Sequence, residues 1–559
     1  MEGLTDASED LHWLDMFCGS HGHDTVVQRI GNRLKLLPLS RKPLAKLVTW
    51  AAACLLIPAW AQAPALSGVG STTSVLPSLG DGSDITLSGE RSIGDRIARE
   101  LYRDPDFIED PILDEYIQSL WRPLVTSALA RGEMSPEMQE RFAWKILLGK
   151  DRSVNAFALP GGYLGVHLGL ISVVSSRDEL ASVMAHELSH VTQRHISRSM
   201  SAQSRMTPIM IGTMILGLLA ASKSPQSAQA LIVGGQAAAI QSQMSFSRDM
   251  EREADRVGYS VMTEAGFDPQ GFVSMFGKLQ QASALNDNGS FPYLRSHPMT
   301  TERMADMQGR QQLLSVRAAL ERPDLEHVIM TARAKVLSQP GVDLLRSWTQ
   351  EAAEPQLARQ PLAKQVSVLY SAAVAQITLR DPQLAQRLVM RLAPLVQSDA
   401  KAYRLVQLLK AEIAHKADDM PGVLAALSAI AAQPASNAVR RPELLAGVQA
   451  RTRLAASPEL HEALLQLRNW LQVHPGDGQA WQALAAGWMT QGRALQSLRA
   501  EGEAQLARMD YSGAIDRFKA AQDVARKQPM QDADHIEASI VDARLRFVQS
   551  LWREQLLER

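Results

Sequence analysis

Cysteine is nearly absent from this chain of 559 residues, which contains only Cys18 and Cys54. Both precede the point where we expect a secretory leader to be cut, as argued below. The mature chain then has no thiol, which excludes a disulfide framework and catalysis by a cysteine nucleophile.

An excess of charge of one sign and long apolar runs are lacking as well. With 58 Lys and Arg against 59 Asp and Glu, the formal net charge is -1, so we expect no nucleic acid as partner. The two most apolar stretches, residues 47–59 and 208–221, are shorter than the roughly 20 apolar residues that cross a bilayer. An integral membrane protein is therefore disfavoured.

The first apolar stretch is organised like a secretory signal peptide. Three basic residues, Arg41, Lys42 and Lys46, precede it, and Ala59-Trp60-Ala61 follows as a small-residue cleavage site. These features in this order are typical of a leader, and a buried apolar helix explains them less well. We expect residues 1–61 to form an N-terminal extension and signal peptide that is cut near Ala61.

The length exceeds that of one ordinary domain, so two or three domains are expected. Residues 62–90 are rich in Ser, Gly, Pro and Thr, which is typical of a flexible linker. A first domain is predicted at residues 91–322 and a second, almost wholly helical one at residues 323–559.

Within the first domain the pattern changes from helical to extended. Apolar spacing is helical from Ile93 to Leu129. Short strands are then predicted at residues 142–148, 154–157 and 163–167, with a turn at Pro160-Gly161-Gly162.

The most informative stretch is His186-Glu187-Leu188-Ser189-His190. The residues from Ser176 to Glu179 have the pattern of a capping box and apolar residues follow at helical spacing, so the motif lies in a helix. Four residues turn a helix by about 400°, which puts both imidazoles on one face. Neutral imidazole suits zinc, and Glu187 could deprotonate a water at the metal. Two exposed histidines on an amphipathic helix are the weaker alternative.

A catalytic zinc site normally has three protein ligands and one open position, so a third ligand must come from elsewhere. His195 would lie about 140° from the ligand face in a continuous helix, and we predict a structural or surface role for it. Glu251 and Asp255 stand four residues apart and face the same way. One could bind zinc while the other orients a ligand or handles a proton. A solvated charged helix face is the alternative.

Three motifs in this order resemble one family. The runs Asn155–Gly162, His186–His195 and Glu251–Asp255 are similar to those of the zinc endopeptidases that include the CAAX prenyl protease and the heat-shock membrane protease HtpX. The closest likeness is to a soluble periplasmic branch with a tetratricopeptide tail. By motif the resemblance covers roughly residues 92–310.

The resemblance implies a mostly α protein: a zincin-like α+β metallopeptidase domain with a small sheet, followed by an all-α tetratricopeptide-like solenoid. It implies one zinc ion per chain, with His186, His190 and Glu251 as ligands, Glu187 as general base and Asp255 as proton donor. It also implies a periplasmic location, and outer-membrane beta-barrel proteins or their assembly machinery as partners.

His297 precedes a proline and is therefore restricted to extended or turn geometry. Three roles stay open for it: a self-inhibiting cap in the open zinc position, a group that stabilises the oxyanion, and a plain loop histidine.

The second apolar stretch, residues 208–221, also has two interpretations. A helix in the core or lining the cleft is favoured. Peripheral contact with a membrane or docking of a partner is the other, because an exposed apolar patch of this kind would have to bind something.

Beyond about Arg322, helical segments with short connections are expected at residues 362–379, 383–396, 400–414, 422–432 and 442–455. Small and large residues then match positions of a tetratricopeptide unit, namely Trp481, Leu484, Ala485, Trp488, Gly502, Tyr511, Ala514, Phe518, Ala521 and Pro529. Such units stack into a solenoid that binds proteins on its concave face. A plain helical bundle is the alternative.

We therefore predict a periplasmic zinc metalloendopeptidase that cleaves misassembled or misfolded envelope polypeptides. The competing hypothesis is a periplasmic chaperone or assembly factor that binds through its helical repeats and has an occluded or regulatory zinc site.

Overall fold

A computed structural model of the chain describes residues 85–201, 246–284, 291–312, 323–338, 340–433, 440–454, 458–527 and 532–557. The predictions for residues 1–61, for most of 62–90 and for 208–221 lie outside these residues. All described residues belong to one compact unit, Leu76–Arg559. Among them, no helix combines the length and the apolar character that crossing a membrane requires.

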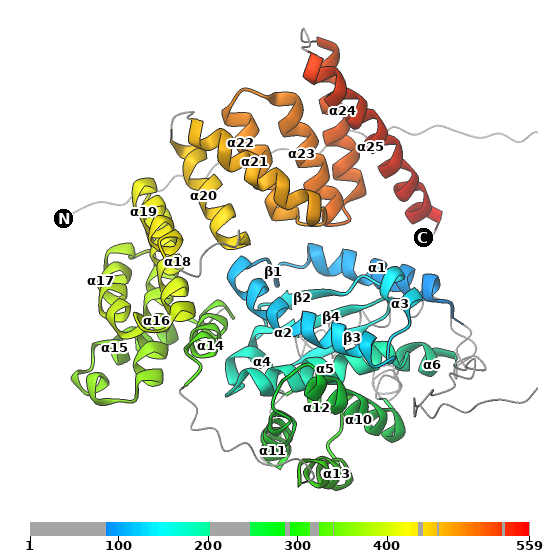
Figure 1. The fold of residues 1–559 in the computed structure, drawn as a ribbon, viewed down its shortest axis with the longest axis vertical. Helices are drawn as coiled ribbons and strands as arrows, with labels where there is room; N and C mark the ends of the chain where they lie inside the picture. Colours follow the sequence, from blue (N-terminus) through cyan, green and yellow to red (C-terminus); the bar gives the residue numbers. More distant parts are fainter. Residues whose placement is uncertain are drawn as a thin grey trace, which may run out of the picture. The chain divides into compact units, whose positions relative to one another are not determined.

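The first part of the chain mixes helices with four short strands (Figure 1). In order they are α1 (Leu87–Arg103), β1 (Phe107–Ile108), α2 (Pro111–Ala130), α3 (Pro136–Arg141), β2 (Lys145–Gly149), β3 (Ala156–Leu159), β4 (Tyr163–His167), α4 (Leu168–Val173), α5 (Arg177–Thr192) and α6 (His195–Ser201). The helices α10 (Arg248–Glu264), α11 (Gln270–Ala284), α12 (Tyr293–Ser296) and α13 (Thr301–Gln312) follow.

The helix predicted from Ile93 to Leu129 is in fact two helices with strand β1 between them. Helix α2 starts afresh because Asp110 accepts a hydrogen bond from the Leu113 backbone nitrogen and Pro111 occupies the first turn. Helix α1 begins at Leu87, within the stretch predicted as linker. The three predicted strands are present, and the first begins only at Lys145 because Trp144 has a positive φ of 48°.

The strand order in the sheet is β1-β2-β4-β3. Strands β2 and β4 are parallel, whereas β1 pairs with β2 and β3 with β4 in antiparallel fashion. Gly161 and Gly162 form the predicted turn between β3 and β4, with φ of 74° and 85° that glycine adopts without strain. Strand β3 is thus an edge strand, and α5 packs against it.

Helix α5 starts as the capping-box pattern predicts. The Ser176 hydroxyl accepts a hydrogen bond from the Glu179 backbone nitrogen at 3.2 Å. The Glu179 carboxylate in turn accepts one from the backbone nitrogen of Ser175, one residue before the cap, at 2.6 Å. The helix is buried from Glu179 to Thr192, so the alternative of exposed histidines on an amphipathic surface is wrong.

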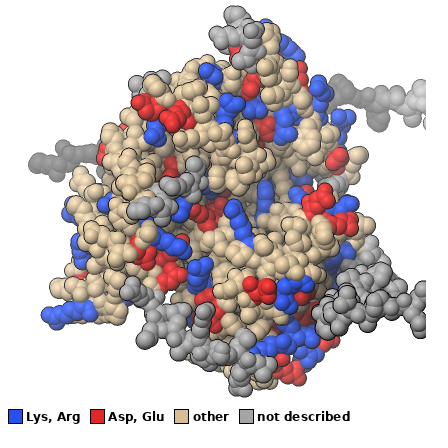
Figure 2. Space-filling view, viewed as in Figure 1, with Lys and Arg blue, Asp and Glu red and all other residues tan. Residues whose placement is uncertain are grey.

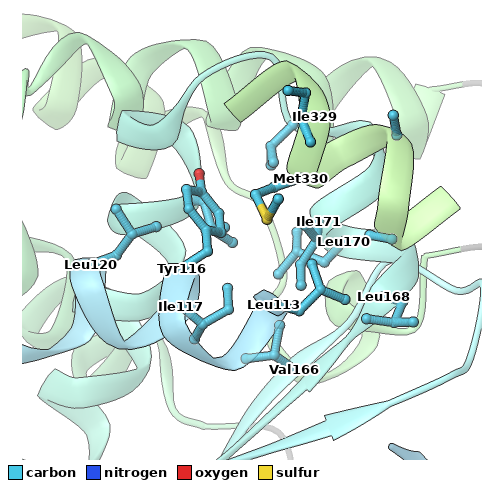
Figure 3. Packing of buried hydrophobic residues seen from close by; sticks show 14 of the residues in the cluster. Leu113, Tyr116, Ile117, Leu120, Val166, Leu168, Leu170, Ile171, Ile329 and Met330 are labelled. Carbon is cyan, nitrogen blue, oxygen red and sulfur yellow. The ribbon is translucent and has the colours of Figure 1, made fainter. Parts of the chain in front are cut away.

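The core of the first part is shared with the start of the tail. Figure 3 shows Leu113 and Ile117 of α2, Val166 of β4 and Leu170 of α4 packed around Met330. Met330 belongs to α14 (Leu325–Leu337), which lies beyond the boundary predicted at residue 322. The first helix of the predicted tail therefore packs as part of the first domain.

The remaining described residues are helical. The elements are α15 (Val342–Ala353), η1 (Pro355–Arg359), α16 (Leu362–Thr378), α17 (Pro382–Leu392), η2 (Ala393–Val396), α18 (Ala400–Lys416), α19 (Met420–Ala431), α20 (Arg441–Arg453), α21 (Pro458–Val473), α22 (Gly478–Thr490), α23 (Ala494–Ala507), α24 (Tyr511–Lys527) and α25 (Asp532–Leu557). The five helical segments predicted between residues 362 and 455 are confirmed, with ends shifted by up to two residues, except that the second ends as an α-helix at Leu392 and continues to Val396 as the 3-10 helix η2.

The predicted small and large positions meet between α23 and α24. A Cβ atom on Gly502 would lie only 2.7 Å from the ring of Phe518, so this position requires glycine. Trp488 is buried, and Trp481 packs half-buried against the same apolar cluster. Both tryptophans therefore stabilise the tail as core residues.

Charged residues join the tail to the start of α2. Asp110, Asp114 and Glu115 pair with Arg333 at 2.6 Å, Arg441 at 3.4 Å and Arg404 at 2.8 Å, respectively. Elsewhere on the face drawn in Figure 2, basic and acidic side chains are interspersed. That mixture agrees with the near-zero net charge.

Candidate metal centre

Helices α5 and α10 approach each other closely at Gly258. A Cβ atom there would lie 3.1 Å from the carbonyl group of Ala185 and from the backbone nitrogen of His186. At the start of α10, Ser247 accepts a hydrogen bond from the Met250 backbone nitrogen at 3.2 Å. The first turn of α10 is thereby fixed, and it places Glu251 against the histidines of α5.

Four side chains converge with one ligand atom each. The Nε2 atoms of His186 and His190 are 3.0 Å apart, and each lies 3.5 Å from a carboxylate oxygen of Glu251. The Nδ1 atom of His297 is 3.0 Å from Glu251 Oε1 and 3.3 Å from His186 Nε2. All four side chains are at most 2% exposed. The structure thus brings together His186, His190 and Glu251, which were predicted as ligands, and adds His297.

These separations fit a single divalent ion. Nitrogen and oxygen ligands at 2.0–2.2 Å from a tetrahedral zinc lie about 3.3–3.6 Å from one another. The observed spacings of 3.0 to 3.5 Å are close to that range. Glu251 Oε2 is also buried and accepts no hydrogen bond in the described part of the chain, although the Arg303 guanidinium lies 2.8 Å from it.

Glu187 lies between this cluster and the edge of the sheet. Its Oε2 atom accepts a hydrogen bond from the backbone nitrogen of Ala158 in β3 at 2.9 Å. Its Oε1 atom is 3.3 Å from His297 Nε2 and accepts no hydrogen bond from any described residue. The carboxylate is thus oriented by one oxygen while the other keeps free lone pairs.

Asp255 lies on the opposite side of His186 from the ligand cluster. Its Oδ1 atom is 2.9 Å from His186 Nδ1. Arg303 of α13 donates two hydrogen bonds to the same carboxylate, at 2.6 and 2.8 Å, and lies 2.8 Å from Glu251 Oε2. Sequence reasoning missed Arg303, because a single arginine about 50 residues downstream carries no motif.

The protonation states of the side chains in the cluster suit metal binding. Burial lowers the pKa of His186, but Asp255 and Glu251 outweigh it and raise this pKa to about 9. Burial and the neighbouring His186 hold the pKa of His190 well below its usual value. Burial opposes ionisation of Glu251, but His297 and His186 keep its pKa well below the ordinary one. His190 is therefore neutral and Glu251 ionised, and His186 must release a proton when a metal binds.

Aromatic rings fix the planes of two histidines. Tyr293 of α12 stacks on His297 with ring centroids 4.5 Å apart, and Phe246 stacks on His190 at 3.9 Å. The backbone nitrogen of His297 donates to the Tyr293 carbonyl oxygen at 2.9 Å, so the short helix α12 brings the ring to the cluster. Neither aromatic residue was predicted.

His195 is fully buried, which excludes the surface role that was one of its two predicted roles. Its Nδ1 atom lies 2.9 Å from His190 Nδ1, on the side of that ring away from Glu251. Burial lowers the pKa of His195, against the opposing effect of Glu253. The other predicted role, a structural one, remains, and the residue that His195 contacts in this role is the candidate metal ligand His190.

The comparison with protein families agrees with this site. Residues 114–311 match the family described as Peptidase family M48, and this range includes every residue of the cluster. This part of the chain is therefore similar to the metallopeptidases of Peptidase family M48.

Known relatives carry a more specific name. The chain is 35% identical over 286 residues to the putative beta-barrel assembly-enhancing protease of Vibrio cholerae serotype O1, covering 50% of this chain and 56% of that protein. It is 29% identical over 432 residues to the beta-barrel assembly-enhancing protease of Yersinia pestis, covering 77% and 83%. The Escherichia coli K12 protein of the same name is 34% identical over 250 residues, covering 44% and 49%. The match thus spans about half the length of two of these relatives and most of the third.

Proposed function

We propose that the protein is a periplasmic zinc-dependent metalloendopeptidase that degrades misassembled or misfolded envelope proteins in connection with outer-membrane beta-barrel assembly. The observation that carries the proposal is the position of Glu187 between the buried cluster of His186, His190, Glu251 and His297 and the edge strand of the described sheet. Zinc is favoured because imidazoles with one carboxylate suit it, whereas magnesium and calcium take oxygen ligands. The predicted leader and the names of the relatives support the location and the connection with beta-barrel proteins.

His186, His190 and Glu251 would hold a divalent ion, which would supply Lewis-acid chemistry by polarising a carbonyl oxygen and lowering the pKa of water. Glu187 accepts the proton of the attacking water on its Oε1 atom, which accepts no hydrogen bond from a described residue, and it can return that proton to the leaving amine. The contacts of Asp255 favour orientation of His186 over the proton donation predicted for it, because Arg303 engages both carboxylate oxygens.

Strand β3 suits the binding of an extended substrate. It is the edge of the described sheet, and the Ala158 nitrogen points toward Glu187 rather than into the sheet. A polypeptide that pairs with this edge is bound through hydrogen bonds of its main chain. Binding of this kind depends little on the sequence of the polypeptide. Low sequence demand fits an enzyme that removes misassembled chains of many kinds.

The test is replacement of Glu187 by Gln, which keeps the shape and one oxygen but cannot accept a proton. We expect Glu187→Gln to bind zinc at one ion per chain and to lose casein cleavage by a factor of at least about 100, the low end for a general base. The matched control is Asp249→Asn, an exposed change that removes one charge, measured in parallel. Cleavage by Glu187→Gln at the native rate would contradict the mechanism.

A groove in the tail favours a second candidate function, that of a chaperone or assembly factor that acts by binding. The groove has a volume of about 600 Å³ and lies between α17, α18 and α19. The side-chain amides of Gln383, Gln386 and Gln407 and the ammonium group of Lys410 line the groove. Gln407 is only 5% exposed, and its side chain has no hydrogen-bond partner among the described residues. Such an amide is satisfied when a polar ligand, such as the backbone of an extended peptide, enters the groove.

Binding of unfolded casein to the Glu187→Gln protein tests this candidate. If the groove binds client polypeptides, Lys410→Glu weakens casein binding, while Lys416→Glu on the exposed face of the same helix does not. Equal binding by both variants would exclude the groove. Loss of binding together with full native function in a cell would exclude binding as the main activity.

A further inference from the structure

His190, the second histidine of the motif, has an unusual neighbour at the ring nitrogen that faces away from the cluster. A histidine that binds a metal through one ring nitrogen usually donates the N–H of the other to a carboxylate, a backbone carbonyl or water. His186 has such a carboxylate beside its second ring nitrogen, since its Nδ1 atom lies 2.9 Å from the Asp255 carboxylate. His190 does not, because its Nδ1 atom lies 2.9 Å from Nδ1 of His195.

A break in the helix brings His195 to this place. In a continuous helix His195 would lie about 140° from the ligand face. Helix α5 ends at Thr192 instead, and Arg194 adopts a left-handed φ of 54° before α6 starts at His195. The Arg194 side chain donates to Glu90 at 2.7 Å, which holds this strained turn in place.

The contacts of His195 continue outward to a carboxylate. Its Nε2 atom lies 3.0 Å from Glu253 Oε2 in α10, and Arg198 of α6 donates to the same oxygen at 3.0 Å. Because a carboxylate only accepts, His195 donates from Nε2 and its Nδ1 atom carries the lone pair. His190 must then donate from Nδ1, so its Nε2 lone pair faces Glu251 and His186.

Stacking on Phe246 cannot replace this contact. The stacked ring, with centroids 3.9 Å apart, fixes the plane of His190 but does not distinguish which nitrogen carries the proton. The hydrogen bond to His195 does distinguish them, because a proton on His190 Nε2 would leave both Nδ1 atoms as lone pairs facing each other at 2.9 Å.

We propose that His195 is a positioning residue for the metal site: it accepts the Nδ1 proton of His190, and Glu253 anchors it. The inference rests on the proposed zinc site and deepens it. It also connects the carboxylate helix α10 to the ligand His190 by a second route, in addition to Glu251. Removing the acceptor therefore weakens metal binding even though His195 touches no metal and no substrate.

The test is the Zn²⁺ affinity of the metal-free full-length protein, measured by competition with a chromophoric chelator. We expect His195→Leu to bind Zn²⁺ roughly 10- to 100-fold more weakly, the usual range for such residues. His195→Asn recovers part of the loss, because its side-chain oxygen lies near the former Nδ1 position and accepts the same proton. Asp249→Asn, an exposed change on α10, keeps the native affinity. The visible spectrum of the Co²⁺-loaded protein shifts in His195→Leu and not in Asp249→Asn.

Native Zn²⁺ affinity in a folded His195→Leu protein overturns the inference. Where His195→Leu fails to fold, Glu253→Ala decides, since Glu253 is partly exposed and its replacement leaves no cavity in the core. Native affinity in Glu253→Ala then overturns the inference, and a several-fold loss supports it. Failure of the unsubstituted protein to bind Zn²⁺ would instead refute the proposed function.

Discussion

His297 belongs to the candidate metal cluster and also lies beside Glu187. Its Nδ1 atom is within 3.3 Å of His186 and Glu251, and its Nε2 atom is 3.3 Å from Glu187. A ring in this place occupies the position that a catalytic metal keeps open for water or substrate. Of the three roles left open by the sequence, this geometry favours the self-inhibiting cap.

Replacement of His297 by Ala is expected to raise casein cleavage several-fold, because it frees both the open position and Glu187. Initial rates at saturating Zn²⁺ measure the effect, with His474→Ala in the tail as control. A collapse of activity would support the oxyanion role instead, and an unchanged rate would leave His297 as a loop histidine. Either result contradicts the cap.

His327 makes stability depend on pH. It is buried, with Nδ1 at 2.7 Å from the Tyr116 hydroxyl and Nε2 at 3.1 Å from the Val174 carbonyl oxygen. Burial lowers the pKa of His327, although the bond to Val174 opposes this effect. The unfolded chain, with a histidine pKa of about 6.5, then binds more protons than the folded one just below that pH. The contribution of His327 is complete above about pH 6.5 and is lost as the pH falls toward its folded pKa.

His327→Gln removes this titration while its amide can still donate to Val174. We expect the melting temperature of the variant to fall less than that of the native chain between pH 7 and pH 5. Calorimetric scans at both pH values measure the difference. Equal slopes for the two proteins would show that His327 is not neutral in the folded state.

The site residues differ in how far the sequence could predict them. His186 and His190 stand four residues apart in one helix, so spacing alone predicts that they share a face, and Glu187 is recognised as part of the same motif. The position of His195 could not be predicted, because the left-handed Arg194 that ends the helix has no glycine or asparagine to signal it. Arg303 reaches the site only through the packing of α13.

Helix α10 contributes to the site because it can approach α5 at Gly258. Replacement of Gly258 by Leu places side-chain atoms against the backbone of Ala185 and His186, which cannot move aside. We expect a loss of about 1–3 kcal/mol, typical of overpacking, together with weaker Zn²⁺ binding as Glu251 shifts. Thermal unfolding and chelator competition measure the two effects.

Gly277→Leu is the matched control for this prediction. Gly277 also lies in a helix, α11, but a Cβ atom there meets nothing within 4 Å. A helix-favouring residue is expected to be neutral or to stabilise by up to about 1 kcal/mol at such a position. Equal losses in both variants would show that helix approach is not the cause.

Secondary structure was predictable where local signals are strong. Helices with a capping side chain and apolar periodicity, such as α5 after Ser176 and α18 after Asp399, begin close to their predicted positions. Strand β1 was missed, because two residues carry no periodic pattern. Its existence depends on pairing with β2, which lies about 40 residues later in the chain.

The join between tail and peptidase domain is built around a buried arginine. Arg333 of α14 pairs with Asp110 at 2.6 Å and with Glu412 of α18 at 2.9 Å. Asp110 is 223 residues away in the sequence, so no local pattern announces this contact. For the same reason the packing of α14 into the core of the first domain could not be predicted from the sequence. The helical character of this segment could be predicted.

Arg333→Met is expected to destabilise the protein by about 3–5 kcal/mol, because it leaves the buried Asp110 carboxylate without its charged partner. The melting temperature measures the loss. Lys364→Met is the control, since its pair with Glu351 is exposed and contributes at most about 1 kcal/mol. A loss in Arg333→Met no larger than that of the control would show that this pair does not hold the tail to the domain.

The central claim is that His186 and His190 of α5 and Glu251 of α10 bind one divalent ion together. Metal analysis of the purified protein after dialysis tests it most directly, with Glu251→Gln compared to Asp249→Asn on the same helix. The account predicts one zinc per chain in the native protein and in Asp249→Asn, and far less than one in Glu251→Gln. A full complement of zinc in Glu251→Gln would contradict it.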